Sequence, residues 1–228
     1  MQVCNNGNPQ PCGARRRLWA VGLAGLVLLT QAACSTSGRV AGERGARSAV
    51  YGHAGLTREQ VREADQQFER GLAALRERRH DEARDIFQLL SEAYPALSGP
   101  VTNLGILNAQ GRDAGRALQD FTRAVEANPR NAVAFNWLGV LHREQGAYGL
   151  AEQAYKKAIA LDADYAAAYR NLGLLYDLYL KRPEAAIAQY QHYLERTQGD
   201  DLIVRVWIKE LEAQGVSTAS LPVMGVMP

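Results

Sequence analysis

A spacing of 34 residues recurs through most of this chain. Four glycines keep it: Gly71, Gly105, Gly139 and Gly173. Three further columns keep the same step, namely the alanines Ala83, Ala117 and Ala151, the aromatics Phe87, Phe121 and Tyr155, and the prolines Pro95 and Pro129. Self-similarity at such a period indicates stacked supersecondary units. The spacing therefore predicts a helical repeat array, which favours a binding scaffold over an enzyme with a catalytic pocket.

Each column has an expected physical role. A glycine inside a helix costs about 1 kcal/mol relative to alanine, so its recurrence needs an offset. We expect that offset to be close approach of a neighbouring helix backbone, with the alanines serving the facing helix in the same way. The aromatic column supplies the apolar area that fills the gap to the next unit. The prolines are expected to end the second helix of their units, because proline cannot continue the backbone hydrogen bonds.

The repeat domain is expected to span residues 57–214. Thr57 and Gln60 have the spacing of a capping box, which predicts a helix start. Units of two helices follow at 64–97, 98–131, 132–165 and 166–199, and the fourth keeps the columns only if one residue is inserted near 180–183. A last helix within 200–214 is expected to cover the end of the array. Residues 215–228 read as a disordered tail.

The column residues resemble those of the tetratricopeptide repeat family, above all Asn103-Leu104-Gly105 with Phe121, and Trp137-Leu138-Gly139 with Tyr155. The resemblance implies an all-α, right-handed α-solenoid whose first helices line a concave groove for peptides or helices of partner proteins. Carried over to this sequence, the groove positions are Thr102, Ile106, Asn136, Val140, Arg143, Arg170, Leu174 and Asp177. The two arginines suit a partner carboxylate, since guanidinium offers planar bidentate donors. For each position the alternative is a solvated helix face.

The N-terminal segment has the layout of a secretory signal. Arg15, Arg16 and Arg17 precede a short apolar stretch, and small residues follow before Cys34. A positive flank, a short apolar core and a small-residue site predict a signal peptide over 1–33. The apolar stretch is short for a membrane span, which needs about 20 apolar residues.

Cys34 is the candidate site of lipid attachment. Two alanines precede it, which resembles a bacterial lipobox and implies acylation of the thiol, although Gln31 stands where that motif usually has an aliphatic residue. By the same resemblance, Ser35 favours the outer membrane, with the protein facing the periplasm. Residues 34–56 lack an apolar period and read as a flexible tether. The alternatives are an ordinary secretory signal or an uncleaved anchor.

Charge and motif content argue against several classes of function. Without residues 1–33 the chain carries 23 basic and 24 acidic residues, so no nucleic-acid partner is expected. The histidines are scattered, no cysteine lies in the repeats, and no phosphate-binding or hydrolase motif occurs. We therefore expect no metal, no cofactor, no small-molecule substrate and no catalytic residue.

The resulting functional expectation is a membrane-tethered scaffold for protein–protein interaction. By resemblance to tetratricopeptide lipoproteins, it assists a cell-envelope complex of the pilus, secretin or energised-transport type. One alternative is a periplasmic adaptor that recruits a peptidoglycan or envelope enzyme, and a less favoured one is an enzyme with an unrecognised site. Helical spacing favours packing for most members of a tyrosine cluster near the end: Tyr165, Tyr169, Tyr176, Tyr179, Tyr190 and Tyr193.

Overall fold

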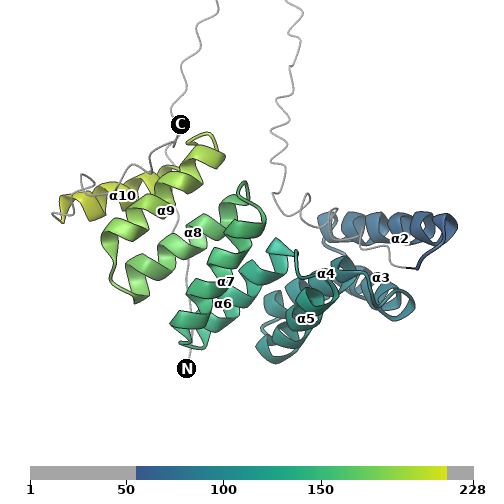
Figure 1. Ribbon diagram of the computed structural model, residues 1–228. Coiled ribbons are helices and arrows are strands. Elements are labelled where there is room, and N and C mark those ends of the chain that lie inside the picture. The colour runs from purple at the N-terminus through teal and green to yellow at the C-terminus, as the bar shows by residue number, and fades with distance from the viewer. Residues whose placement is uncertain (1–54, 215–228) are drawn as a thin grey trace, which may run out of the picture. The chain divides into compact units, whose positions relative to one another are not determined.

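Residues 55–214 are described by the structure, a computed structural model, and they form nine α-helices and one π-helical turn, with no strand among them (Figure 1). The helices are α2 (Arg58–Arg76), α3 (His80–Ala93), α4 (Ser98–Gln110), α5 (Ala114–Ala127), α6 (Ala132–Glu144), α7 (Tyr148–Leu161), α8 (Ala166–Leu174), η1 (Leu175–Tyr179), α9 (Pro183–Arg196) and α10 (Leu202–Ala213). The expected signal segment, Cys34, nearly all of the tether and the expected tail lie outside the described residues. No helix within residues 55–214 combines the length and apolar character that crossing a membrane requires.

The helices pack in the order in which they follow one another in the chain. Each helix contacts the next, and the first helices of successive units also meet, α4 with α6 and α6 with α8. The pairs are therefore α2 with α3, α4 with α5, α6 with α7, and α8 with α9, followed by α10 (Figure 1). This arrangement confirms the all-α solenoid of helical repeats that the spacing predicts.

Capping residues and prolines set the helix limits. At the start of α2 the Thr57 hydroxyl accepts from the Gln60 amide at 3.2 Å, and the Gln60 side chain accepts from the Thr57 amide at 2.9 Å. The expected capping box is therefore present. Helix α3 ends at Ala93 and α5 at Ala127, each two residues before a proline, because proline has no amide hydrogen to continue the ladder.

The glycine column faces aromatic rings. A Cβ atom added to Gly71 would lie 2.6 Å from the ring of Phe87 in the same unit, and one added to Gly139 would lie 2.5 Å from the Tyr155 ring. Gly105 and Gly173 face rings in the same way. The prediction that these glycines admit a neighbouring helix backbone was therefore wrong: they admit the large side chain of the second helix in their own unit.

The aromatic and alanine columns form the core. Phe87, Phe121, Tyr155 and the three column alanines are fully buried. The Phe121 ring also stacks on Trp137 of the next unit, with 5.7 Å between centroids. One ring thus fills the space against its own glycine and, as the sequence predicts, the gap to the following unit.

The fourth unit absorbs its extra residue in a π-helical turn. Helix α8 passes directly into η1, and the Leu180 amide donates to the Leu175 carbonyl, a span of five residues rather than four. The extra residue, expected near 180–183, is therefore accommodated mostly in η1, before the loop that leads to α9. Beyond it the register is restored, because Tyr190 lies against Gly173 as Tyr155 lies against Gly139.

Candidate functional site

Two of the expected groove residues lie inside the repeat stack. Thr102 is 2% exposed; its hydroxyl donates to the Ser98 carbonyl at 2.7 Å and accepts from the Asn131 side chain at 2.8 Å. Asn131 also caps α6 by accepting from the Ala134 amide at 3.0 Å. Thr102 therefore joins α4 to the start of α6, and it does not present its hydroxyl to a partner.

Asn136 has the corresponding role one unit later. It is 4% exposed, and its amide oxygen accepts from Asn171 at 3.0 Å while its amide nitrogen approaches the Tyr165 hydroxyl at 3.4 Å. These bonds connect α6 to the start of α8 and use both ends of the Asn136 amide within the repeat stack. Burying a side-chain amide costs little free energy when both its oxygen and its nitrogen have hydrogen-bond partners, which explains why a polar residue is buried here.

The apolar candidates are half-buried between units. Ile106 packs against the core between α4 and α6, whereas Val140 and Leu174 pack against the cluster around Tyr155 and Tyr190. Each keeps part of its side chain accessible. They therefore provide an apolar floor next to the charged candidates.

Arg143 and Arg170 are the candidates best suited to a partner. Arg143 extends from α6 over the ring of Tyr179, with 5.8 Å from the guanidinium carbon to the centroid, and Arg170 extends from α8 over Trp207 at 5.6 Å. In both, the Nε atom is buried and has no hydrogen-bond partner among the described residues. Neither guanidinium forms an ion pair within residues 55–214.

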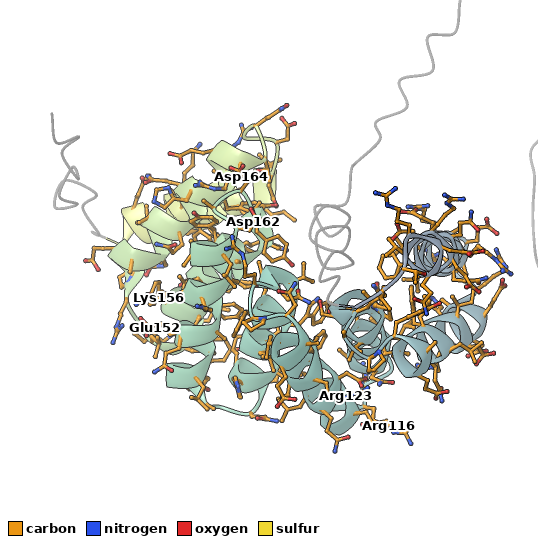
Figure 2. All side chains as sticks on the ribbon, turned by 45° about the vertical axis from the view of Figure 1, so that its right-hand side comes forward. Arg116, Arg123, Glu152, Lys156, Asp162 and Asp164 are labelled. Carbon is orange, nitrogen blue, oxygen red and sulfur yellow. The ribbon has the colours of Figure 1, made fainter. Side chains whose placement is uncertain are left out.

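One acidic side chain does feel the charge of Arg170: the pKa of Asp201 is lowered against the effect of its burial, first by the Tyr193 hydrogen bond and also by the charge of Arg170. Most ion pairs in the described part of the chain join residues four or fewer positions apart, such as Glu152 and Lys156 at 2.7 Å on α7 (Figure 2). The remaining groove candidate, Asp177, lies half-buried in η1 and accepts from the Tyr190 hydroxyl at 3.2 Å. Burial raises the pKa of Tyr190 well above its usual range, and the charge of Asp177 acts in the same direction.

The name "arginine surface" is used below for Arg143 and Arg170 with the rings of Tyr179 and Trp207. A guanidinium placed over a ring keeps its outer N–H donors free for a carboxylate or phosphate. Within residues 55–214 no group of His, Cys, Asp and Glu side chains is arranged to hold a metal ion. The chemistry that this surface offers is recognition of an anion next to an apolar floor.

Sequence reasoning did not assign the two rings as arginine partners. Tyr179 was grouped with tyrosines expected to pack, yet it is 41% exposed, whereas Tyr165, Tyr169, Tyr176 and Tyr190 are buried. The sequence signal that could have paired each arginine with its ring is their spacing: Tyr179 follows Arg143, and Trp207 follows Arg170, by slightly more than one repeat. That distance places each ring on the next helix of the same layer.

Comparison with known proteins identifies the repeat. A family model described as tetratricopeptide repeat matches residues 54–98 and 102–166. No curated protein matches the chain in sequence. Among solved structures, the chain is similar to Pseudomonas aeruginosa pilF, with TM-score 0.60 and 21% identity over 67% of this chain and 68% of that one.

Two further structures share the fold. MamA from Desulfovibrio magneticus RS-1 has TM-score 0.56 and 20% identity, covering 68% of this chain and 87% of that one. The tetratricopeptide repeat protein TTC0263 of Thermus thermophilus has TM-score 0.55 and 20% identity, covering 67% and 82%. Identities this low show the fold alone, but together with the family match and the repeat columns they agree on one architecture. The chain belongs to the tetratricopeptide repeat family.

Proposed function

We propose that this protein is a non-catalytic scaffold whose arginine surface binds an acidic segment of a partner protein. The observation that carries the proposal is the pair of guanidiniums, Arg143 and Arg170, each next to an aromatic ring, with buried Nε atoms that have no hydrogen-bond partner and with no direct ion pair within residues 55–214. Tetratricopeptide repeats form protein-interaction scaffolds, so an unpaired cationic surface on the first helices is a natural binding position. The half-buried Val140 and Leu174 would pack against apolar residues next to the acidic ones.

The physical basis is preorganisation. Each arginine already lies on an aromatic ring, so less side-chain entropy is lost when a carboxylate binds. A hydrogen bond to a charged group contributes about 1.5–3 kcal/mol, and two such anchors suit a moderate, specific interaction. Removing one guanidinium is therefore expected to weaken partner binding about tenfold or more.

We further propose that the scaffold is held by lipid on Cys34 at the periplasmic face of a bacterial outer membrane. There it assists assembly of a cell-envelope complex of the pilus, secretin or energised-transport type. The signal-like segment before Cys34 supports this location. The similarity to pilF is compatible with it, although that likeness concerns the fold.

The anchor is tested by fractionating cells that express the full chain or its Cys34→Ser variant. The proposal expects the unaltered protein in the membrane fraction and the variant in the soluble periplasm. A Cys34→Ser protein that stays in the membrane fraction contradicts lipid anchoring at this residue.

The binding surface is tested by crosslinking in the native cell with an Arg143→Gln/Arg170→Gln variant. Its matched control is Arg62→Gln/Arg130→Gln, which removes the same charge at exposed positions elsewhere. We expect the control to retain crosslinked partners and the first variant to lose them, with both keeping native helical circular dichroism. Equal capture by both variants contradicts the proposed surface. Capture of a peptidoglycan enzyme, rather than an assembly component, favours the adaptor alternative.

A further inference from the structure

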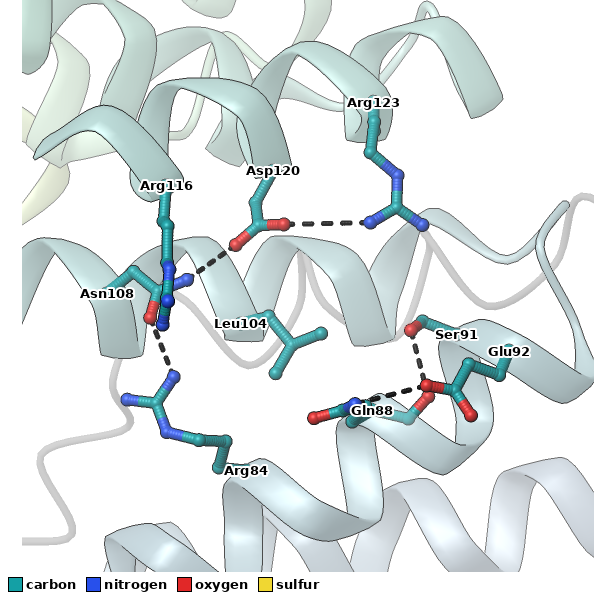
Figure 3. Close-up of a pocket in the computed structure, with 9 residues that line it drawn as sticks. All are labelled: Arg84, Gln88, Ser91, Glu92, Leu104, Asn108, Arg116, Asp120 and Arg123. Carbon is teal, nitrogen blue, oxygen red and sulfur yellow. Dashed lines mark hydrogen bonds and ion pairs between the residues drawn. The ribbon is translucent and has the colours of Figure 1, made fainter. Parts of the chain in front are cut away.

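A polar pocket lies between the second helices α3 and α5, apart from the residues of the arginine surface. Its cavity volume is about 290 Å³ (Figure 3). Its charged lining consists of Arg84, Arg116, Arg123, Glu92 and Asp120, and Asn108 of α4 lies at its base. Three arginines from two successive units thus lie around one cavity.

Asn108 connects the charged groups. Its side-chain oxygen accepts from the Arg84 guanidinium at 2.6 Å, and its side-chain nitrogen donates to the Asp120 carboxylate at 2.7 Å. Arg123 approaches the other oxygen of Asp120 at 3.7 Å. Asn108 is only 8% exposed, so this buried amide fixes a cation and an anion of neighbouring units at the cavity (Figure 3).

The pocket exists because this unit departs from the repeat pattern. Two units later, the columns of Asn108 and Arg84 hold Tyr176 and Glu152, whose side chains are joined by a hydrogen bond of 2.9 Å. Asparagine is much shorter than tyrosine, so it leaves space where Tyr176 places its ring.

Asp120 also departs from its column, where the first and third units have Ile86 and Ala154. Burying a carboxylate at a position that is apolar in the first and third units is costly unless it is compensated. Local departures of this kind are expected at functional sites. The second unit therefore combines a shortened residue, a half-buried acid and two of the three cations, and the first unit supplies the third, Arg84.

The charge balance of the pocket favours an anion. Three guanidiniums face two carboxylates, and Glu92 is already engaged by the Gln88 amide at 3.1 Å. Burial raises the pKa of Asp120 above its ordinary value, although the Asn108 bond and the charges of the arginines act in the opposite direction. Arg116 pairs with Asp113 at 3.4 Å, but its side chain is 74% exposed and free to reorient (Figure 2).

We propose that this pocket is a binding site for an oxyanion, a carboxylate or phosphate group, held by Arg84, Arg116 and Arg123. Planar guanidinium donors match both groups bidentately. The volume exceeds that of a bare phosphate, so the ligand carries this group on a small body or side chain. The site uses none of the residues of the arginine surface and does not depend on the proposed function.

The test is titration of the full-length chain with inorganic phosphate and, separately, with glutarate at constant ionic strength, followed by calorimetry. Binding by either probe is expected, and the stronger one identifies the preferred group. The Arg116→Gln/Arg123→Gln variant, altered only at exposed side chains, is expected to raise the dissociation constant about tenfold or more. Arg62→Gln, an exposed arginine of α2, is the control and is expected to bind as the unaltered chain does.

A second variant tests the origin of the cavity. Asn108→Tyr restores the residue type of the fourth unit, fills the space and is expected to abolish binding. Absence of binding by both probes in the unaltered chain overturns the proposal. Equal dissociation constants for the Arg116→Gln/Arg123→Gln and control variants overturn it as well, because the probe then binds without the arginines of the pocket.

Discussion

Replacing Gly139 by alanine is the most direct test of how the repeat columns fit together. Gly139 lies inside α6, and an added Cβ atom would meet three ring atoms of Tyr155 at 2.5, 2.6 and 2.9 Å. Real Cβ atoms essentially never approach other heavy atoms closer than 3.0 Å. The Tyr155 ring is fully buried, so moving it away from an added Cβ atom would displace its neighbours in the core.

Two opposing effects determine the size of the change. Alanine inside a helix is favoured over glycine by about 1 kcal/mol. Overpacking a filled core costs about 1–3 kcal/mol, and contact with three atoms of an immobile ring places this site near the upper end. The net result is a loss of about 2 kcal/mol, or roughly 4–8 °C in Tm for a domain of this size.

The measurement is thermal unfolding of the full chain followed by helical circular dichroism, with Gly149→Ala as the matched control. Gly149 lies in the first turn of α7 and has nothing within 4 Å of an added Cβ, so that variant is expected to keep or raise Tm. In a Tyr155→Leu background the Gly139→Ala change is expected to become neutral or stabilising, because the ring is gone. An unchanged Tm for Gly139→Ala, or the same loss in both backgrounds, refutes the ring-against-glycine account.

Three further substitutions and one change of pH probe the buried polar groups. Tyr155→Phe removes a buried hydroxyl with no hydrogen-bond partner among the described residues, so it is expected to raise the free energy of unfolding, measured in urea, by about 1 kcal/mol. Tyr190→Phe loses the hydrogen bond to Asp177, so it is expected to lower the same free energy by a similar amount. Asn131→Ala removes both the cap of α6 and the bond to α4, so its unfolding free energy is expected to fall by about 2 kcal/mol or more. Burial raises the pKa of Tyr165 from 10.0 to about 12, so the stabilisation from keeping this hydroxyl neutral is intact below pH 10 and about 2–3 kcal/mol of it is lost as pH rises toward 12. Burial also raises the pKa of other tyrosines, so the loss is measured as the difference in urea unfolding between the unaltered chain and Tyr165→Phe at each pH.

The sequence predicted the helical architecture because most of the residues that recur every 34 positions are buried in the core. Gly105, Ala117 and Phe121 all lie in the core, and the prolines follow the helices that they were expected to end. A period identifies which positions face inward. It does not identify which neighbour each position meets, and so the glycines were assigned a backbone as partner instead of a ring.

The polar residues on the first helices could not be assigned from a single sequence. Thr102 and Asn136 occupy positions that the family resemblance placed on the groove, yet their partners Asn131 and Asn171 lie about one repeat later in the chain. Whether such a side chain faces a ligand or the next helix depends on a small rotation about the helix axis. Periodicity does not fix that rotation.

The one-residue insertion in the fourth unit shows how an array can change one surface without losing its core. The π-helical turn at η1 takes up the extra residue, and the Tyr190 ring still lies against Gly173, where an added Cβ atom would be 2.5 Å from it. Its effect is confined to the end of the first helix, where it places the exposed Tyr179 against Arg143. Insertions of this type often occur at functional sites, because they reorient side chains over a single turn. The irregular turn therefore belongs to the arginine surface, while the regular columns only support it.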